Sequence, residues 1–357
     1  MYSDLSKFCT TDDSTIAEAV ALLDQQRLGI ILVVDQASRL LGTVTDGDIR
    51  RAILAALDFR EPLKTLLERK AGSPQAKPIS APAWADRGTC LRLLQAHKIL
   101  HLPLLDEDGR VAGLVTRDDF LPDEVLPLQA VVMAGGAGIR LRPLTEEVPK
   151  PMLPVGGRPL MERIIERLRQ AGIRRVNVMT HYKPEKIIEH FGNGDAFGVE
   201  LTYVREDEPL GTGGGLGLMP APPEPLLVVN GDILTGVDFR AMLAFHQENR
   251  AEMTVAVCRH DVQVPYGVIE CEGAKVRRLS EKPTLNLLVN SGIYLLEPSV
   301  YSYVPNGRHF DMTDLIQALL DAGRRVVGFP IREYWLDIGA HDDYRRAETD
   351  VQKGKMD

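Results

Sequence analysis

The sequence predicts an α/β protein in two parts: a tandem pair of small α+β repeats, then a larger doubly wound domain with a mostly parallel sheet. Three observations lead to this fold class. A segment in the first third of the chain occurs twice, strands and helices alternate after residue 127, and a short apolar run at the start of the second part ends in a cluster of glycines. At 357 residues, the chain is long enough for each part to bury its own core.

The duplication lies in the N-terminal part. Residues 33–49 align without a gap on residues 104–120, at an offset of 71 residues. Each copy has the order helix, strand, turn, strand, helix, and the first helices are predicted at 15–26 and 89–97. Both copies contain Gly-x-x-Thr-x-x-Asp ahead of the last helix. A Thr or Asp at this place can cap the helix or hold a ligand, and the residues alone leave both roles open.

The second part begins after a proline-containing linker at 121–127, so the predicted domains are 1–127 and 128–357. A turn-rich segment at 71–78 separates the two repeats. The elements expected in the second part are strands at 128–134, 175–180, 200–205 and 226–230, and helices at 160–171, 184–191 and 314–322. Their alternation is typical of a parallel sheet covered on both faces. Ligands bind such sheets at the carboxyl ends of the strands, where the strand order reverses.

The glycine cluster is the first candidate for a ligand site. The run from Gly135 to Gly138 follows the apolar strand, and Arg140 and Lys150 come shortly after it. Glycine lets backbone N–H groups approach phosphate oxygens, and the two cations would neutralise a triphosphate. The run is not a P-loop, which requires Gly-Lys-Ser/Thr, nor a dinucleotide fingerprint, because Leu141 stands where the third glycine belongs. The alternative is a glycine-rich strand-to-helix turn with a surface arginine.

Composition narrows the classes of function. The formal net charge is −8, so nothing suggests nucleic acid as a partner. No apolar run approaches the roughly 20 residues of a membrane span, and the N-terminus lacks the basic and apolar segments of a signal peptide. We therefore expect a cytoplasmic protein that does not bind membranes. The four cysteines show no Cys-x-x-Cys spacing, which argues against structural zinc and a disulfide framework.

Further motifs support the interpretation of the glycine cluster. Gly135–Leu141 reads Gly-Gly-Ala-Gly-Ile-Arg-Leu, and Pro149–Pro154 reads Pro-Lys-Pro-Met-Leu-Pro. With these motifs the sequence strongly resembles the sugar-phosphate nucleotidyltransferases, the NDP-sugar pyrophosphorylases. One departure is Ile139, where the family usually has a threonine. Other segments match the family in the same order, namely Pro209–Gly215, Leu226–Asp232, Tyr266–Val268, Glu281–Pro283, Asn290–Tyr294 and Trp335–Gly339.

This resemblance implies a Rossmann-like nucleotidyltransferase domain with defined roles for its residues. Asp232 and Asp337 would hold Mg²⁺, the one cofactor expected, because Mg²⁺ prefers one or two carboxylates together with phosphate oxygens. Arg140 and Lys150 would stabilise the pyrophosphate and the α-phosphate, and Lys282 would bring in the sugar phosphate. The nucleotide would contact Ala134, Gly135, Gly136, Gly138, Gly211, Thr212 and Gly231. The sugar would contact Gly267, Glu281 and Asn290.

The repeats resemble CBS domains, whose tandem copies pair into a module that often binds adenine nucleotides. The resemblance implies an adenine or guanine nucleotide as a regulatory ligand, held by Thr45 with Asp48 and by Thr116 with Asp119. It also implies a homodimer formed through the CBS pair.

The resemblance implies nucleotidyl transfer without a covalent enzyme intermediate, from an NTP to a sugar 1-phosphate. GTP is the expected nucleotide, because a CBS pair on such a domain, without a C-terminal left-handed β-helix, resembles guanylyltransferases that make GDP-hexoses or GDP-hexosamines for surface glycans. The same reaction with UTP, CTP or dTTP is one alternative. A catalytically inactive sensor that keeps the nucleotide fold is another. The third is a binding module whose main function lies in the CBS pair.

Overall fold

The structure is a computed structural model that describes residues 5–26, 28–72, 76–120 and 125–356. It divides into two compact units, residues 1–124 and 125–357. The predicted linker at 121–127 and the turn-rich segment at 71–78 lie partly outside the described residues. Within the described ranges, no helix is both long and apolar enough to cross a membrane.

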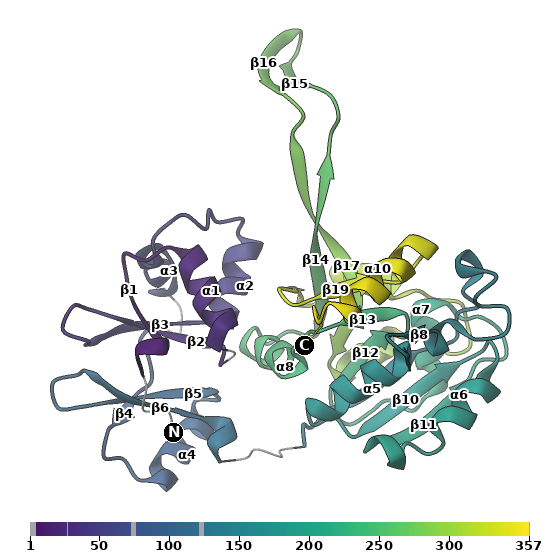
Figure 1. Cartoon of the computed structure of the whole chain (residues 1–357), viewed down its shortest axis with the longest axis horizontal. Helices are drawn as coiled ribbons and strands as arrows, with labels where there is room; N and C mark the ends of the chain where they lie inside the picture. The colour runs from purple at the N-terminus through teal and green to yellow at the C-terminus, as the bar shows by residue number, and fades with distance from the viewer. Residues whose placement is uncertain (1–4, 27, 73–75, 121–124, 357) are drawn as a thin grey trace. The chain divides into compact units, whose positions relative to one another are not determined.

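The N-terminal unit contains two three-stranded sheets, ordered β1-β2-β3 and β4-β5-β6 (Figure 1). In each sheet the first pair of strands is parallel and the second pair is antiparallel. The elements are β1 (Cys9–Thr11), α1 (Ile16–Gln26), β2 (Ile30–Val34), β3 (Leu40–Thr45), α2 (Asp46–Leu54), α3 (Leu63–Lys70), β4 (Ala81–Pro82), α4 (Arg87–Ala96), β5 (His101–Leu105) and β6 (Val111–Thr116). The predicted first helix of each copy is therefore confirmed as α1 and α4.

The duplication extends from sequence to strand register. Ile30 pairs with Thr45 and, 71 residues later, His101 pairs with Thr116. Both sheets also have an irregularity at the same place, between Val33 and Val34 and between Leu104 and Leu105. The turns of the two copies bond to each other reciprocally, since Leu40 N–H donates to Gly109 O (3.1 Å) and Val111 N–H donates to Ser38 O (3.0 Å). The two repeats thus form one pseudo-symmetric module.

The copies differ after their shared Thr-x-x-Asp pattern. The last helix of the first copy forms as α2, whereas a 3₁₀ turn at Arg117–Asp119 follows β6 in the described part of the second copy. The residues that follow this turn, 121–124, lie outside the described part of the chain. The first copy also carries α3, which the alignment of the repeats did not predict. Leu63 and Leu66 of α3 are buried in the core of the first copy.

The second unit is built on a seven-stranded sheet of order β11-β10-β7-β12-β17-β14-β18. β11, β10, β7 and β12 are parallel, and β17 is antiparallel to both of its neighbours. The elements are β7 (Gln129–Met133), β8 (Pro154–Val155), β9 (Arg158–Pro159), α5 (Leu160–Gln170), β10 (Arg175–Thr180), α6 (Pro184–Phe191), β11 (Glu200–Arg205), α7 (Gly211–Gly214), β12 (Leu226–Asn230), β13 (Ile233–Thr235), α8 (Phe239–Glu248), β14 (Met253–Gln263), β15 (Val268–Glu272), β16 (Lys275–Ser280), β17 (Thr284–Leu296), α9 (Met312–Asp321), β18 (Val326–Pro330), β19 (Trp335–Asp337) and α10 (His341–Gln352). The mostly parallel, doubly wound fold is confirmed.

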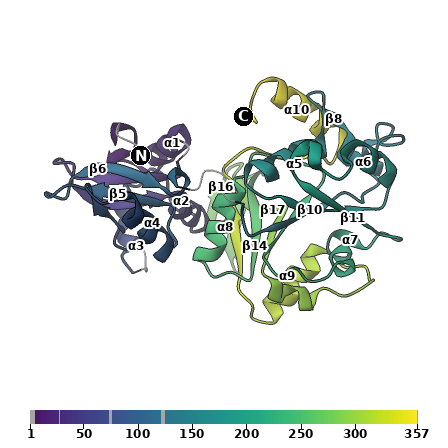
Figure 2. The same cartoon turned by 90° about the horizontal axis from the view of Figure 1, so that it is seen from below.

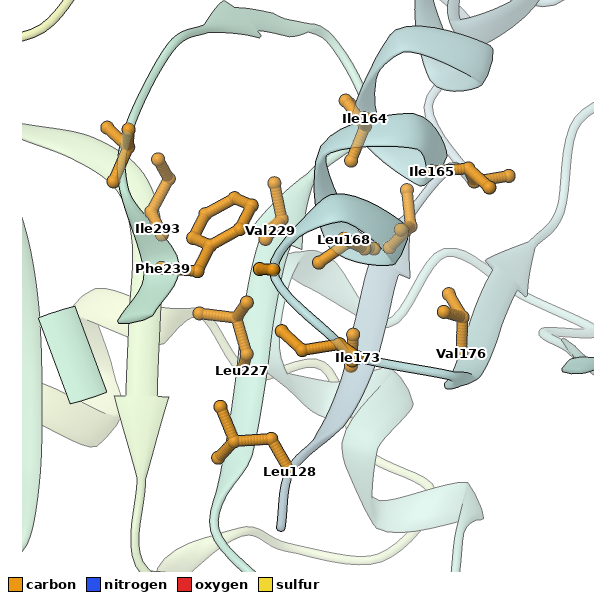
Figure 3. Close-up of a cluster of buried hydrophobic side chains, with 14 of the residues drawn as sticks. Leu128, Ile164, Ile165, Leu168, Ile173, Val176, Leu227, Val229, Phe239 and Ile293 are labelled. Carbon is orange, nitrogen blue, oxygen red and sulfur yellow. The ribbon is translucent and has the colours of Figure 1, made fainter. Parts of the chain in front are cut away.

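Both faces of the central strands are buried, which explains why their sequences are continuously apolar rather than alternating. Leu227 and Val229 of β12 face one core, which contains Ile164 and Leu168 of α5 (Figure 3). The intervening Val228 faces a second core formed with α9. Helices α5 and α6 accordingly lie on one side of the sheet and α9 on the other (Figure 2). This packing fixes the strands whose ends carry the polar candidates.

The outer halves of β14 and β17, together with β15 and β16, form a two-stranded arm over residues 258–289 that projects from the domain (Figure 1). Only the inner half of β14, Met253–Val257, also pairs with β18. The arm exposes an unusual number of large apolar side chains, namely Val262, Tyr266, Ile269, Val276, Leu279, Leu285, Leu287 and Leu288. The predicted sugar-binding residues lie on this arm or at its base.

Candidate active site

The polar candidates of the second unit lie where the parallel strands end. β10 and β11 lie on one side of β7 and β12 on the other, so the strand order reverses between β7 and β12. The glycine run follows β7, and Asp232 follows β12 directly beside it. This is the crevice at which open α/β sheets bind their ligands.

A cavity of about 420 Å³ opens at this edge. It is lined by Gly136, Ala137, Gly138, Ile139, Arg140, Leu141, Lys150, Asp232 and Gly339. The structure therefore brings together residues 136–138 of the glycine run, both predicted cations and one of the two predicted metal ligands, whereas Gly135 does not line the cavity. The other, Asp337, lies two residues before Gly339 in the chain.

Two glycines of the run have different roles. Gly138 has a φ of +61°, and a Cβ there would lie 2.8 Å from Cγ2 of Thr145 and 3.1 Å from Cβ of Lys150. The Thr145 hydroxyl donates to Gly138 O at 2.8 Å, which holds the turn closed. A Cβ on Gly136 would meet no atom within 4 Å. Gly138 is thus needed for the turn, while the backbone at Gly136 is open to an approaching ligand.

Ala134 and Gly231 lie at the junction of β7 and β12 and do not line the cavity. Gly231 N–H donates to Met133 O at 2.9 Å, and a Cβ on Gly231 would lie 2.7 Å from that oxygen. Ala134 N–H donates to Met179 O at 2.9 Å. Both residues let the strand ends approach each other closely, which positions the two loops of the site.

A short antiparallel strand pair brings the two aspartates together across more than a hundred residues. In β13 and β19, Ile233 pairs with Asp337 and Leu234 with Leu336. Ile338 N–H also donates to Asp232 O at 3.1 Å. Asp232 and Asp337 therefore lie on adjacent segments, close enough for their carboxylates to interact electrostatically.

The charges at this place are coupled. Lys150 is 8% exposed, and its Nζ lies 2.6 Å from Oδ2 of Asp232. Desolvation and the neighbouring Asp232 carboxylate raise the pKa of Asp337 above its usual value, although Lys150 and Arg140 act in the opposite direction. The cations around Asp337 therefore offset the burial of this carboxylate and the charge of Asp232 only in part. A further positive charge would be stabilised there.

The donor set suits Mg²⁺ bound to a nucleotide. Within the described ranges, no group of three or more His, Cys, Asp or Glu side chains forms a metal cluster. A pair of aspartates is nevertheless the number of carboxylates Mg²⁺ takes when phosphate oxygens and water complete its six ligands. Asp232 and Asp337 would hold the ion beside the open face of the glycine run.

The second glycine segment, in α7, is held by another part of the chain. Thr212 N–H donates to Oδ1 of Asp311 at 2.8 Å, and the Thr212 hydroxyl donates to the same oxygen at 3.1 Å. A Cβ on Gly211 would lie 2.8 Å from Phe310 O. Neither Gly211 nor Thr212 lines the cavity. Packing against residues 308–312 is a sufficient reason for the glycines, and Asp311 anchors this loop.

The predicted sugar-binding residues are not brought to the cavity, since Gly267, Glu281, Lys282 and Asn290 do not line it. Gly267 and Glu281 face each other across the arm, where a Cβ on Gly267 would lie 3.0 Å from Oε2 of Glu281. Lys282 is exposed and has a positive φ of +45°, which is strained for a residue other than glycine. Asn290 lies at the base of the arm, and its Oδ1 accepts from Gly292 N–H at 3.1 Å.

Sequence reasoning missed two polar residues at the strand ends. Asn230 is the last residue of β12, and its buried Oδ1 has no hydrogen-bond partner. Glu206 follows β11 and is only 5% exposed. The signal that identified Asp232 was an acidic residue at the end of an apolar strand, and Asn230 is a polar residue at the end of the same strand. Glu206 lacked this signal, because β11 before it begins and ends with charged residues.

In the N-terminal unit, the four predicted regulatory residues form matching capping boxes. Oδ2 of Asp48 accepts from Thr45 N–H at 2.9 Å, and Oδ2 of Asp119 accepts from Thr116 N–H at 2.8 Å. Asp48 is also paired with Lys70 of α3, whose Nζ lies 2.8 Å from Oδ2. Desolvation raises the pKa of Asp48, but the positive charges of Lys70 and Arg51 lower it by more, so the pKa lies below its usual value. The ion pair of Asp48 with Lys70 therefore stabilises the folded protein above the usual pKa of an aspartate, and this stability is lost as the pH falls through the lowered pKa of Asp48.

The fold and the site define a class of protein, namely α/β domains that present a glycine loop, cations and paired carboxylates to a ligand at the switch point of the sheet. The family model of the nucleotidyl transferases matches residues 129–354, which is more than half of the chain. The chain belongs to this nucleotidyl transferase family. The CBS domain model matches residues 6–55 and 84–122.

Individual relatives agree with this assignment. A mannose-1-phosphate guanylyltransferase of Mycobacterium tuberculosis is 36% identical over 236 residues, 64% of this chain and 65% of that protein. A UTP–glucose-1-phosphate uridylyltransferase of Synechocystis is 32% identical over 241 residues, 62% of each chain. The chain thus spans less than two thirds of the length of these relatives. A Bacillus anthracis crystal structure, named as a candidate glucose-1-phosphate thymidylyltransferase, matches with a TM-score of 0.52 and 27% identity over 62% of this chain and 94% of that one.

Proposed function

We propose that the chain is a Mg²⁺-dependent sugar-1-phosphate nucleotidyltransferase that uses GTP. The observation that carries the proposal is the convergence of Arg140, Lys150, Asp232 and Asp337 on the open face of a glycine loop. These groups can hold and neutralise a triphosphate. Among the relatives, the first is named for mannose 1-phosphate and guanylyl transfer, which supports GTP over UTP or dTTP.

In the proposed reaction, an oxygen of the sugar 1-phosphate forms a bond to the α-phosphorus of the NTP. The bond from that phosphorus to the bridging oxygen of the β-phosphate breaks, and pyrophosphate leaves with the electron pair. No general base is needed, because the phosphate monoester is already an anion at neutral pH. The protein contributes positioning and charge neutralisation. Bound Mg²⁺ would supply Lewis-acid stabilisation of the phosphate oxygens.

A pyrophosphate-release assay tests this function. The full-length protein would be given each of five NTPs with mannose, glucose, glucosamine and heptose 1-phosphates, with and without Mg²⁺. GTP with one of the sugar phosphates should give the highest kcat/KM, and removing Mg²⁺ should abolish turnover. If no combination of NTP and sugar phosphate releases pyrophosphate, the inactive sensor is favoured. A preference for another NTP would overturn the choice of GTP and leave the reaction unchanged.

Arg140→Ala and Lys282→Ala should separate the two substrates. Losing Arg140 leaves a phosphate of the NTP without its cation, so the KM for the NTP should rise by about 10-fold or more. Losing Lys282 should raise the KM for the sugar 1-phosphate instead. Initial rates with each substrate varied in turn would measure both effects.

The Lys282 variant is the stricter test of the proposed roles, because Lys282 lies outside the cavity in the structure. For Lys282 to contact the sugar phosphate, the arm must bend towards the glycine loop. Lys275→Ala, also on the arm, is the matched control and should change neither KM. If both lysine variants behave like the unmodified protein, Lys282 does not belong to the site.

For the CBS pair, the proposal is an adenine or guanine nucleotide that binds at the capping boxes and alters catalysis in the other unit. Asp119→Ala should abolish the effect of the nucleotide and leave activity without it unchanged. The effect itself should change substrate affinity by about 5- to 150-fold, the usual range of allosteric coupling. Calorimetry with the full-length protein would measure binding.

Asp48 is a less suitable position for this test. Its partner Lys70 has a side chain only 12% exposed, and breaking a buried ion pair costs about 3–5 kcal/mol. Asp48→Ala should therefore lower the melting temperature of the N-terminal unit whether or not a nucleotide binds. If no nucleotide binds, the CBS pair is better explained as a dimerisation module, which light scattering would detect.

A further inference from the structure

The segment 135–146, which we call the phosphate loop, is fastened to the neighbouring strand by one side chain. Tyr182 is the second residue after β10. Its backbone N–H donates to Gly135 O at 3.4 Å, at the start of the loop. Its hydroxyl lies 3.1 Å from Thr145 O and 3.1 Å from Glu146 O, so its one proton is shared between two carbonyl oxygens at the end of the loop. Tyr182 thus holds both ends of the phosphate loop, and no step of the proposed reaction uses it.

The end of the loop is joined in turn to its middle. Thr145 is fully buried, and its hydroxyl donates to Gly138 O at 2.8 Å. On the other side of Arg140, the carbonyl oxygen of Arg142 lies 2.9 Å from Nε2 of His341. Neither Thr145 nor His341 lines the cavity. The backbone is therefore held on both sides of Arg140 by groups that leave the cavity free for a ligand.

The residue after Tyr182 adds a second contact to the same place. Lys183 Nζ donates to Glu146 O and lies 3.4 Å from Oε2 of Glu147. In an extended chain, consecutive side chains point in opposite directions, yet Tyr182 and Lys183 both bond to residues 145–147. Lys183 has a φ of +48°, a left-handed conformation that is unfavourable for a residue other than glycine. The bonds to the phosphate loop are a physical reason for this strained conformation.

We propose that Tyr182 is a positioning residue that orders the phosphate loop before the nucleotide binds. The proposal rests on the proposed function and deepens it. The N–H groups of the glycine run and the guanidinium of Arg140 converge on one set of phosphate oxygens only when the loop has one conformation. A loop that is not ordered beforehand must lose its conformational freedom on binding, which weakens the binding. The effect of Tyr182 should therefore be confined to the NTP and pyrophosphate, the ligands that the phosphate loop would hold.

The test compares Tyr182→Phe with the unmodified full-length protein, since this substitution removes one oxygen atom and keeps the ring. The KM for GTP should rise by about 3- to 10-fold, the effect expected for one hydrogen bond, and the KM for the sugar 1-phosphate should not change. In the ligand-free protein, amide hydrogen exchange at residues 136–146 should become faster by a similar factor, because the loop would open more often. Exchange measured by mass spectrometry reports on this order without any catalysis.

Tyr203→Phe is the matched control. Tyr203 lies on β11, and its hydroxyl donates to Gly192 O at 2.8 Å, so the substitution also removes a tyrosine hydroxyl from a backbone carbonyl oxygen. It should leave the KM for GTP and the exchange at residues 136–146 unchanged. If Tyr182→Phe gives the same results as Tyr203→Phe, the proposal is wrong. If Tyr182→Phe raises both KM values equally and speeds exchange throughout the second unit, its role is only structural, and the proposal is wrong as well.

The failure of this proposal can be told apart from failure of the proposed function. If the unmodified protein prefers another NTP, the KM for that NTP takes the place of the KM for GTP in the comparison. If the unmodified protein releases no pyrophosphate with any NTP, the reaction is wrong, and hydrogen exchange still tests Tyr182. Equal exchange at residues 136–146 in the unmodified protein and in Tyr182→Phe would then overturn the role of Tyr182.

Discussion

Asp232→Asn and Asp337→Asn should each lower turnover by at least about 10²-fold, because each would remove a negative charge from the proposed Mg²⁺ site, where the ion would stabilise the transition state. The fold should survive, since the pairing of β13 with β19 is between backbones and does not depend on either carboxylate. Initial rates at saturating GTP, sugar 1-phosphate and Mg²⁺ would measure the loss. Asp342→Asn, at an exposed position on α10, is the matched control and should retain full activity.

The raised pKa of Asp337 predicts a pH dependence of Mg²⁺ binding, which is expected if Asp337 is a ligand of the metal. A carboxylate must lose its proton to bind Mg²⁺, so Mg²⁺ affinity should fall as the pH drops through this raised pKa. Without Mg²⁺, the raised pKa of Asp337 makes its ionised form unfavourable in the folded protein, so it lowers the stability at neutral pH. Below the pKa that this aspartate has in the unfolded chain, the effect on stability disappears. Asp337→Asn should therefore raise the melting temperature of the metal-free protein at pH 7. Near-normal turnover in either variant would remove that aspartate from the site.

Lys150→Ala should lower turnover by about 10²- to 10³-fold, which is the range for removing one preorganised electrostatic group. Lys150 is 8% exposed and lies 2.6 Å from Asp232, so it is held rigidly against the phosphate site. Its loss leaves the two aspartates without their closest cation. The KM for Mg²⁺ should then fall or stay constant while kcat drops, because the metal keeps both carboxylates.

Lys186→Ala, at an exposed position on α6, is the matched control for this variant and should be unchanged. Lys150→Arg should recover only part of the activity, since the larger guanidinium must enter a site fitted to an ammonium group. If Lys150→Ala raises KM for GTP without changing kcat, Lys150 binds the nucleotide in its ground state only. The proposed transition-state role would then be wrong.

Much of the fold followed from local patterns. The repeat offset of 71 residues predicted the two copies. The structure adds that their strand registers repeat at the same offset, because similar apolar patterns select similar pairing. The strands at 175–180 and 200–205 were predicted at their observed bounds, since each is a short segment with β-branched residues between turn signals. Helix α3 was missed because it has no counterpart in the second copy.

The sequence by itself determined the chemistry that this protein presents: a glycine run, two cations and two aspartates, each recognisable from residues close in the chain. Only the tertiary structure decided which of them meet. The pairing of β13 with β19 brings Asp337 to Asp232, and strand order places Glu206 on the far side of the glycine run. Strand order also puts Lys282, between β16 and β17, on the arm and outside the cavity. Such contacts depend on strand order and long-range pairing, which local periodicity does not encode.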